Sequence, residues 1–194
     1  MSRPRAFDQQ ELLDGAMRLF WARGYGATSV DDVVRATGVS RSSLYGLYPD
    51  KHALFIAALT QYLGRVTGEH ARVLDTAPRA ADGIRRFLGN LAKRASRPET
   101  AGRGCMLTNS AIESPEIGAD GRRLVRQALE RVQERLRRTL VRAQAEGDLA
   151  PEVDPDAYAH QLLALIQGLR VLGRAGMPGA GLRRAVESAL TPIH

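Results

Sequence analysis

The stretch GYGATSVDDVVRATGVSRSSLYGLYPDKHALF, residues 24–55, decides the fold of this chain. Ser29, Ser40 and Asp50 each stand directly before a run in which apolar residues recur at helical spacing, and Ser and Asp are favoured at helix N-caps. Gly38 separates the first two runs, and glycine tolerates the left-handed backbone at the end of a helix. The stretch therefore predicts two short helices joined by a tight turn, followed by a long helix.

The two short helices have the proportions of a helix–turn–helix unit. Val34, Val39 and Leu44 fall where the two helices must pack together, and the second helix is polar where it faces outward. In such a unit the second helix presents its N-terminal residues to base edges in the major groove. We expect the exposed face to consist of Arg41, Ser42, Ser43, Tyr45 and Gly46. The alternative is an ordinary corner between helices of a helical core.

The flanks of this unit place further groups where a DNA phosphate could lie. Thr28 and Ser29 stand at a helix N-terminus, where backbone N–H groups and the helix dipole favour an anion. Lys51 falls in the first turn of the next helix, an unfavourable place for a cation unless an anion is near. We therefore predict that three helix N-termini grip one DNA backbone.

The rest of the chain shows helical periodicity and almost no strand signal. We expect helices at about 8–23, 29–37, 41–48, 51–74, 79–96, 105–113, 117–146, 155 onward and 182–190. The prediction is an all-α protein with an N-terminal three-helix helix–turn–helix domain at 1–52 and a C-terminal helical effector-sensing and dimerisation domain at 53–194.

Composition narrows the class of protein. Of the 194 residues 44% are apolar, enough for a core, and no stretch reaches the ~18 consecutive apolar residues of a membrane helix. The first ten residues lack the apolar run of a secretion signal, and the single cysteine fits a reducing compartment. We expect a cytoplasmic protein. The net charge is +7, but residues 1–52 hold seven basic and six acidic side chains, so charge alone is weak evidence for DNA binding.

The motifs Gly24–Val33, Ala36–Ser40, Ser43–Tyr45 and Tyr48–Phe55 together resemble the DNA-binding domain of the TetR family. The resemblance covers about residues 8–60. It implies an all-α homodimeric DNA-binding regulator, usually a repressor, with a divergent ligand-binding C-terminal domain and a near-palindromic double-stranded operator. It implies phosphate contacts and groove contacts at Thr28, Ser29, Arg41, Ser42, Ser43, Tyr45, Gly46, Tyr48 and Lys51. The family often has an aromatic or basic residue where Gly46 stands, so the resemblance does not define the base preference. It often has a polar or aromatic residue where Leu47 stands.

The segment 103–113, RGCMLTNSAIE, is a candidate sensor. Helical spacing places Cys105, Asn109 and Glu113 on one face. A helix N-terminus and the adjacent Arg103 would both lower the pKa of the Cys105 thiol, and the thiolate is the reactive form. The segment resembles that of a TetR subgroup in which some members sense electrophiles or oxidants through this cysteine. The alternative is a buried structural cysteine, because free cysteines are among the most buried residues.

A noncovalent effector pocket is a second hypothesis for the C-terminal half. Such pockets are mostly apolar with a few placed polar groups. The candidate lining is Phe87, Leu91, Met106, Asn109, Ile112, Leu136, Leu163, Ile166 and Gln167, and each apolar member could instead be plain core. The last two helices lie where TetR-family dimers associate, and we expect Leu162, Ile166, Leu169, Leu172, Val186 and Leu190 at that interface.

An enzyme and a purely structural adaptor are the competing classes. His52, His70, His160 and His194 show no metal-ligand spacing, and the chain lacks a phosphate-binding Gly-rich loop. A catalytic cysteine would need a histidine base that the sequence does not place. We therefore expect no catalysis, no cofactor, no metal and no membrane partner. The Arg-rich run 122–142 is interpreted as a solvated helix face rather than a second nucleic-acid patch.

Overall fold

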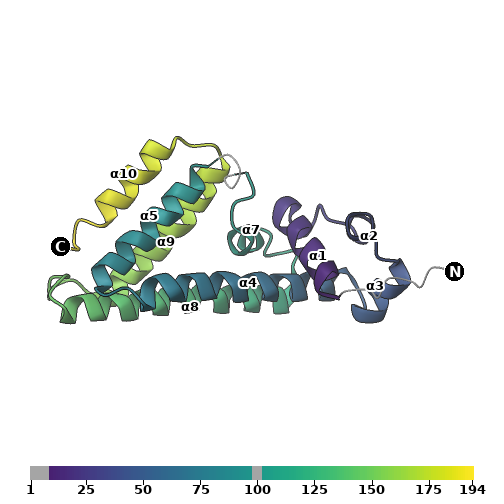
Figure 1. Ribbon diagram of the computed structural model, residues 1–194, viewed down its shortest axis with the longest axis horizontal. Coiled ribbons are helices and arrows are strands. Elements are labelled where there is room, and N and C mark those ends of the chain that lie inside the picture. The colour runs from purple at the N-terminus through teal and green to yellow at the C-terminus, as the bar shows by residue number, and fades with distance from the viewer. Residues whose placement is uncertain (1–8, 98–101) are drawn as a thin grey trace.

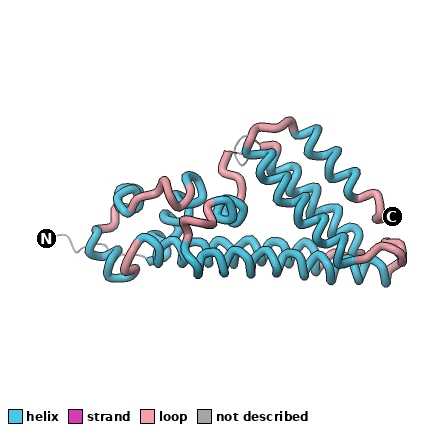
Figure 2. Tube along the Cα trace, turned by 180° about the vertical axis from the view of Figure 1, so that it is seen from behind, coloured by secondary structure: helices cyan, strands magenta, loops and turns pink. Residues whose placement is uncertain are grey.

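The computed structural model describes residues 9–97 and 102–194, and in these ranges the regular structure is helical (Figures 1 and 2). The helices are α1 (Gln9–Arg23), α2 (Val30–Thr37), α3 (Arg41–Leu47), α4 (Lys51–Asp75), α5 (Ala80–Ala95), α7 (Met106–Ile112), α8 (Gly118–Ala145), α9 (Pro155–Arg174) and α10 (Gly179–Ala189). One isolated bridge joins Leu149 to Ile193. The predicted all-α class is confirmed, with helix ends within a few residues of expectation.

The predicted caps at the start of α2, α3 and α4 are present. The Ser29 hydroxyl accepts the Asp32 N–H, and the Asp32 carboxylate accepts the Ser29 N–H, which completes a capping box. Ser40 and Asp50 accept backbone N–H groups three residues later, at 3.1 and 2.7 Å. Gly38 ends α2 with φ 69°, in the left-handed region that favours glycine.

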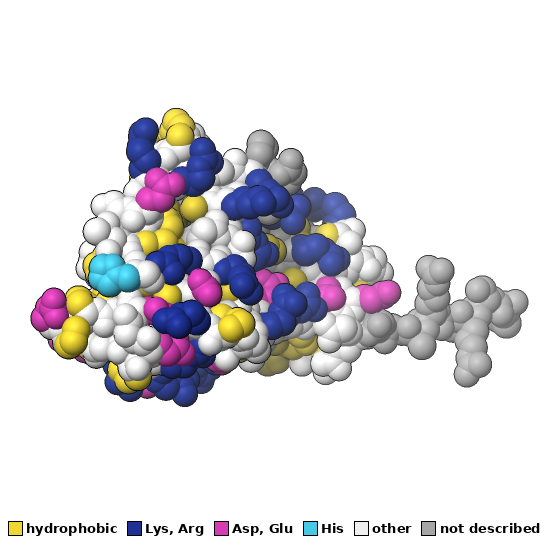
Figure 3. Space-filling model, turned by 60° about the vertical axis from the view of Figure 1, so that its left-hand side comes forward, with side chains coloured by type: hydrophobic (Ala, Val, Ile, Leu, Met, Phe, Trp, Pro, Cys, Tyr) yellow, Lys and Arg dark blue, Asp and Glu magenta, His cyan; other side chains and the backbone are white. Residues whose placement is uncertain are grey.

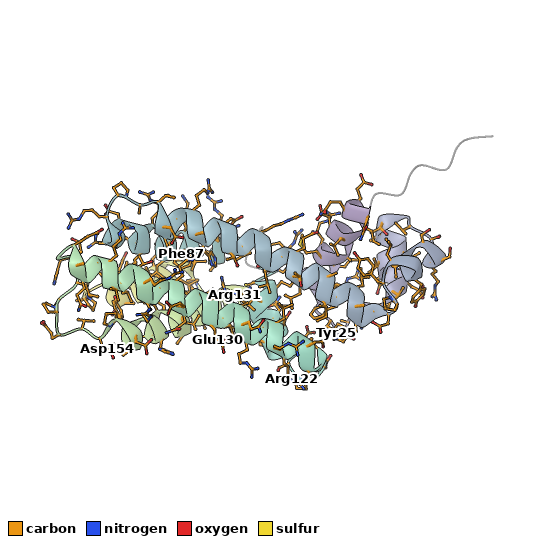
Figure 4. All side chains as sticks on the ribbon, turned by 90° about the horizontal axis from the view of Figure 1, so that it is seen from below. Tyr25, Phe87, Arg122, Glu130, Arg131 and Asp154 are labelled. Carbon is orange, nitrogen blue, oxygen red and sulfur yellow. The ribbon has the colours of Figure 1, made fainter. Side chains whose placement is uncertain are left out.

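Two long helices set the shape of the molecule. α4 and α8 run side by side along its length, with α1, α2 and α3 at one end and α5, α9 and α10 at the other (Figure 1). The short α7 lies between these two groups and contacts α1, α4, α8 and α9. In the view from below, Tyr25 lies beside the Arg122 end of α8 (Figure 4). The end that holds α1, α2 and α3 is therefore joined to the rest by α4, α7 and the start of α8.

The N-terminal core reaches beyond the predicted boundary at residue 52. Phe20 and Phe55 are almost fully buried and pack edge to face at 5.2 Å between ring centroids. The same cluster includes Cys105, Met106 and Ile117. Burial of these apolar side chains ties α7 and the start of α8 to α1 and α4. Apolar contacts thus extend across residue 52, and the division into two domains there stays a prediction.

The second core lies between α5, the later half of α8, α9 and α10. Leu162, Leu169 and Val186 were expected at a dimer interface, but each is at most 4% exposed inside this core. Ile166 is likewise fully buried there. The expectation was wrong for these four because their stripe packs against neighbouring helices of the same chain. A hydrophobic period identifies a buried face without identifying what covers it.

Several arginines of α8 form ion pairs with acidic side chains. Arg126 pairs with Glu130, Arg142 with Glu146, and both Arg137 and Arg138 with Glu134. Figure 3 shows basic side chains scattered among acidic ones on the face that it presents. These exposed pairs support the interpretation of a solvated face. In residues 9–97 and 102–194 we find no helix with the length and apolar character needed to cross a bilayer.

The short α3 depends on one buried side chain. Leu44 is 0% exposed, whereas Leu47, three residues later on the same helix, is 40% exposed. We expect Leu44→Ala to lower the free energy of unfolding by about 2–5 kcal/mol, because the removed atoms leave a cavity. Leu47→Ala should change it by less than about 0.5 kcal/mol. Urea denaturation at one fixed protein concentration measures both, and equal losses would contradict the packing described here.

Candidate functional site: the recognition helix and an inner cavity

The outer face of α3 is polar and open. Arg41, Ser42 and Ser43 are exposed around the buried Leu44, and Tyr45 is 45% exposed. A Cβ atom added at Gly46 would meet nothing within 4 Å, so this position also opens to solvent. The structure therefore brings the predicted groove-facing residues onto one exposed surface, next to the N-terminus of their helix.

The polar groups of this surface are held by neighbours from α2 and α3. Arg41 forms an ion pair with Asp31 of α2. The hydroxyl of Ser40 lies 3.0 Å from that of Ser42 and 2.8 Å from that of Ser43. Such exposed contacts are weak and can be exchanged for contacts with DNA. These contacts hold the side chains of Arg41, Ser42 and Ser43 in place when no DNA is bound.

Two residues predicted to contact DNA are instead buried. Thr28 is 1% exposed, and its hydroxyl donates to the carbonyl of Gly24 at 2.7 Å, where it holds the turn after α1. Tyr48 is 8% exposed and belongs to the N-terminal core. Tertiary packing thus takes up both side chains, and their contacts with DNA stay predictions. Ser29 remains exposed at the N-terminus of α2.

Lys51 has a partner within the protein. Its Nζ lies 4.3 Å from the centroid of the Tyr25 ring and donates to the Gly26 carbonyl at 3.4 Å. A cation over an aromatic face is stabilised by the ring quadrupole. This contact accounts for a lysine in the first turn of α4 without any phosphate, so the phosphate contact of Lys51 stays a prediction.

Residues 103–120, which comprise α7, the residues on either side of it and the first residues of α8, contact the end that holds α1, α2 and α3, and we call them the link segment. The carboxylate of Glu113 accepts the backbone N–H of Tyr25 at 2.8 Å and that of Gly26 at 3.4 Å. Asp120 hydrogen-bonds His52, one residue into α4, at 2.8 Å. This bond contributes most to lowering the pKa of the Asp120 carboxyl. The turn between α1 and α2 is therefore held directly by the link segment.

The first half of the link segment is bound to α1. The Trp21 indole N–H donates to the Gly104 carbonyl at 3.1 Å. The Asn109 amide donates to the carbonyls of Arg103 at 3.0 Å and Trp21 at 3.4 Å. Asn109 was expected to orient an effector, but these contacts occupy it in joining the loop to α1. A displacement of residues 103–109 would therefore alter these contacts with α1.

An inner cavity of about 260 Å³ lies beside these contacts, where α1, α4, α5, α9 and the start of the link segment meet. It is lined by Met17, Trp21, Tyr62, Arg65, Val66, Glu69, His70, Leu91, Arg94, Ala95, Gly104, Cys105, Arg170 and Arg174. Apolar and aromatic walls with a few charged groups are typical of small-molecule sites.

Cys105 is the nucleophile of the inner cavity. It is 5% exposed, and its Sγ accepts a hydrogen bond from the Tyr62 hydroxyl at 3.3 Å. Burial raises the pKa of the thiol, but the charge of Arg170 and hydrogen bonds from Tyr62 and Thr108 outweigh it and hold the pKa below its usual value. The cation responsible is Arg170 of α9, whereas the sequence pointed to the adjacent Arg103.

Two other titratable groups of the cavity stay uncharged near neutral pH. Burial, with a smaller contribution from Arg170, lowers the pKa of His70 to about 4. Burial and the neighbouring Cys105 raise the pKa of Tyr62. Tyr62 therefore serves Cys105 as a hydrogen-bond donor. In the part of the chain that the structure describes, no group of three or more His, Cys, Asp and Glu side chains is arranged to hold a metal ion.

The residues predicted to line one noncovalent pocket do not meet in one place. Ile112 is 69% exposed, whereas Met106, Leu136, Ile166 and Phe87 are at most 3% exposed within the cores. Leu163 lines a separate surface hollow with residues of α8. Only Leu91 and Cys105 line the inner cavity, and Gln167 accepts the Thr108 hydroxyl at 2.8 Å. The prediction of a single lining set was wrong, because sequence spacing does not show which faces converge.

Sequence reasoning missed most of the residues that line the inner cavity, among them Trp21, Tyr62 and Arg170. Arg170 carries a signal that could have identified it, because it stands four residues after the buried Ile166 on α9. An arginine in register with a buried stripe is unusual, since charged side chains are seldom buried without a partner. Trp21 and Tyr62 follow the inward stripes of α1 and α4 and look like ordinary core.

Comparison with known proteins gives concordant matches. The family model "Bacterial regulatory proteins, tetR family" matches residues 12–58, and "Tetracyclin repressor-like, C-terminal domain" matches residues 80–189. The HTH-type transcriptional repressor ComR of Escherichia coli strain K12 is 32% identical over 194 residues, which cover 99% of this chain and 90% of ComR.

Solved structures agree with these matches. A cysteine mutant of the TetR family transcriptional regulator CifR, complexed with 26-base-pair double-strand operator DNA, is 31% identical with a TM-score of 0.85 and covers 100% of both chains. Reduced NemR from E. coli, 19% identical with a TM-score of 0.87 over 95% of this chain and 96% of NemR, shares the fold. The chain belongs to the TetR family of bacterial transcriptional regulators.

Proposed function

We propose that this regulator is a repressor that binds a near-palindromic operator as a homodimer and leaves it when a small molecule or electrophile reaches Cys105. The observation that carries the DNA-binding part is the exposed polar face of α3, with Arg41 at its N-terminal end. The operator complex of CifR and the repressor ComR support the same role. Because its target is the chromosome, we place its action in the cytoplasm.

The outer face of α9 is the surface that we assign to dimerisation. Val171 and Leu172 are 45% and 43% exposed in the single chain, and Met177 after the helix is 50% exposed. Leu190 at the end of α10 is partly exposed. Neighbouring exposed apolar side chains favour association with a second copy. In a two-fold dimer the two α3 helices would face successive major grooves ~34–36 Å apart.

The link segment supports a route from Cys105 to DNA. Cys105 lies at the start of α7, and Glu113 at its end holds the turn that leads into α2. An adduct on Sγ needs space that the Tyr62 contact now occupies, so the start of α7 must move. We infer that this movement is passed to the α1–α2 turn and to α4, which changes the spacing of the recognition helices.

The first prediction concerns DNA. The wild-type protein should bind a fragment from upstream of its own gene, with two chains per site and an affinity that falls steeply with salt. Arg41→Ala should weaken binding by about 1–3 kcal/mol, because an arginine at this position pairs with a base edge. Fluorescence anisotropy with labelled fragments measures this.

Arg86→Ala provides the matched control, because Arg86 is exposed on α5 at the opposite end of the molecule (Figure 1). Its affinity should equal that of the wild type. Equal losses in the two variants would show that general positive charge, and not the face of α3, binds DNA. One chain per site would contradict the dimer.

The second prediction concerns Cys105, the only cysteine in the chain. Iodoacetamide should form one thioether with loss of iodide, and the DNA affinity should then fall in the wild type but not in Cys105→Ser. Because the pKa of the thiol is lowered, the alkylation rate should reach half its maximum below pH ~8.5, the usual thiol value. Intact mass spectrometry follows the adduct. Loss of DNA binding in treated Cys105→Ser would exclude Cys105 as the sensor.

The third prediction concerns the link. Glu113→Ala removes the acceptor for the Tyr25 and Gly26 N–H groups. The ratio of DNA dissociation constants after and before alkylation should fall, by a factor on the order of 2 to 30 for a coupling loss of ~0.5–2 kcal/mol. Glu113→Gln, which keeps an acceptor, should lose less. Glu130→Ala, an exposed acid on α8, is the control and should keep the full ratio. An unchanged ratio in Glu113→Ala would rule out this route.

A further inference from the structure

Arg170 points to a ligand class for the inner cavity. In residues 9–97 and 102–194, two buried side-chain nitrogen atoms have no hydrogen-bond acceptor, Nη1 of Arg170 and Nε2 of Gln167. They stand three residues apart on α9, so they share a face of that helix. Buried donors nearly always have acceptors in native proteins. Of the two, only Arg170 lines the inner cavity, and its unmatched donor indicates that an acceptor comes from outside the chain.

The other charges of the cavity wall leave Arg170 without a carboxylate. Arg65 is paired with Asp14 at 2.5 Å, and Arg94 with Glu69 at 2.9 Å. Glu69 is the one carboxylate among the lining residues. The wall therefore has an excess of positive charge, and that excess is centred on α9.

The remaining wall is apolar and aromatic. The rings of Trp21 and Tyr62 meet edge to face at 5.2 Å between centroids, and Val66 and Leu91 complete this side. The volume of about 260 Å³ lies just below the ~300–1,000 Å³ range of ligand pockets. A ligand that fits must be small, with an apolar body and an anionic end.

We propose that the inner cavity binds a small organic carboxylate, with its carboxylate on the guanidinium of Arg170 and its apolar body against Trp21 and Tyr62. The planar guanidinium matches a carboxylate through two parallel hydrogen bonds. This inference names the chemical class of the noncovalent effector, and it rests on the proposed function only for the release of DNA. Binding itself is independent of DNA.

Cys105 gives this proposal a second consequence. Arg170 favours the anionic form of Cys105, so a carboxylate that neutralises Arg170 withdraws that support. A bound carboxylate also fills space beside Sγ. Carboxylate binding must therefore slow the alkylation of Cys105.

Trp21 is the only tryptophan of the chain and lines the cavity, so its fluorescence reports occupancy. The full-length protein would be titrated with benzoate and phenylacetate, and in parallel with the neutral amides benzamide and phenylacetamide. We expect a saturable change in emission, with each carboxylate binding at least tenfold more tightly than its amide. Iodoacetamide labelling of Cys105 should slow over the same concentration range.

Variants at Arg170 separate charge from shape. Arg170→Met should bind acid and amide equally, whereas Arg170→Lys should keep part of the preference for the acid. Arg86→Met on α5 should behave as the wild type. Urea unfolding followed by Trp21 emission verifies that each variant is folded. The proposal is overturned if neither carboxylate binds, if acid and amide bind alike in the wild type, or if folded Arg170→Met and Arg170→Lys both retain the full preference.

Measurements of DNA affinity distinguish the ligand class of the cavity from the role of that ligand as an effector. Carboxylate binding that also lowers DNA affinity supports both the ligand class and the effector role. Carboxylate binding without any effect on DNA supports the ligand class and removes the effector role of the carboxylate. No carboxylate binding, with DNA still released by iodoacetamide, overturns the ligand class and leaves the electrophile response in place.

Discussion

The hydrogen bonds from the backbone N–H groups of Tyr25 and Gly26 to the carboxylate of Glu113 join the two halves of this protein. The turn after α1 has no helix of its own to satisfy these donors, and an acid from a segment almost ninety residues later supplies the acceptor. The Asp120–His52 and Gly104–Trp21 contacts stand on either side of it along the link segment. The orientation of α2 and α3 relative to the C-terminal half therefore depends on where residues 103–120 lie.

The free energies of these hydrogen bonds indicate that the contacts of the link segment can be broken without unfolding the protein. A hydrogen bond to a charged group contributes about 1.5–3 kcal/mol, and one with neutral partners about 0.5–1.5 kcal/mol. Allosteric couplings are typically 1–3 kcal/mol, so the loss of one or two contacts of the link segment is of the right size. The apolar packing of Phe20 against Phe55 is larger and lies outside the link segment. An effector can thus shift the DNA-binding end without unfolding it.

Local chemistry was predictable from the sequence, and long-range packing was not. The caps at Ser29, Ser40 and Asp50 are as expected because a cap involves residues only three apart. Thr28 shows what local sequence does not predict. Its position before a helix follows from its neighbours in the sequence, but its burial depends on distant elements. The dimer residues on α9 failed for the same reason, because the buried stripe faces α5 and α8. Arg170 was missed because an arginine is usually assigned to solvent. Its position four residues after the buried Ile166 places it on the same face of α9 and indicates burial.

The relation between Arg170 and Cys105 explains why this cavity suits a switch. A guanidinium that is partly withdrawn from water is stabilised by a nearby anion, and the charge of Arg170 in turn helps to hold the pKa of the Cys105 thiol below its usual value. A thioether at Cys105 cannot ionise, so it could not serve as a counter-charge for Arg170. The cavity would then favour any arrangement that returns Arg170 to water or to another acceptor. The start of α7 lies next to this cavity, α7 contacts α9, and α7 is the helix that ends at Glu113. We therefore propose that chemistry at the sulfur atom of Cys105 is passed through α7 to the turn that leads into α2.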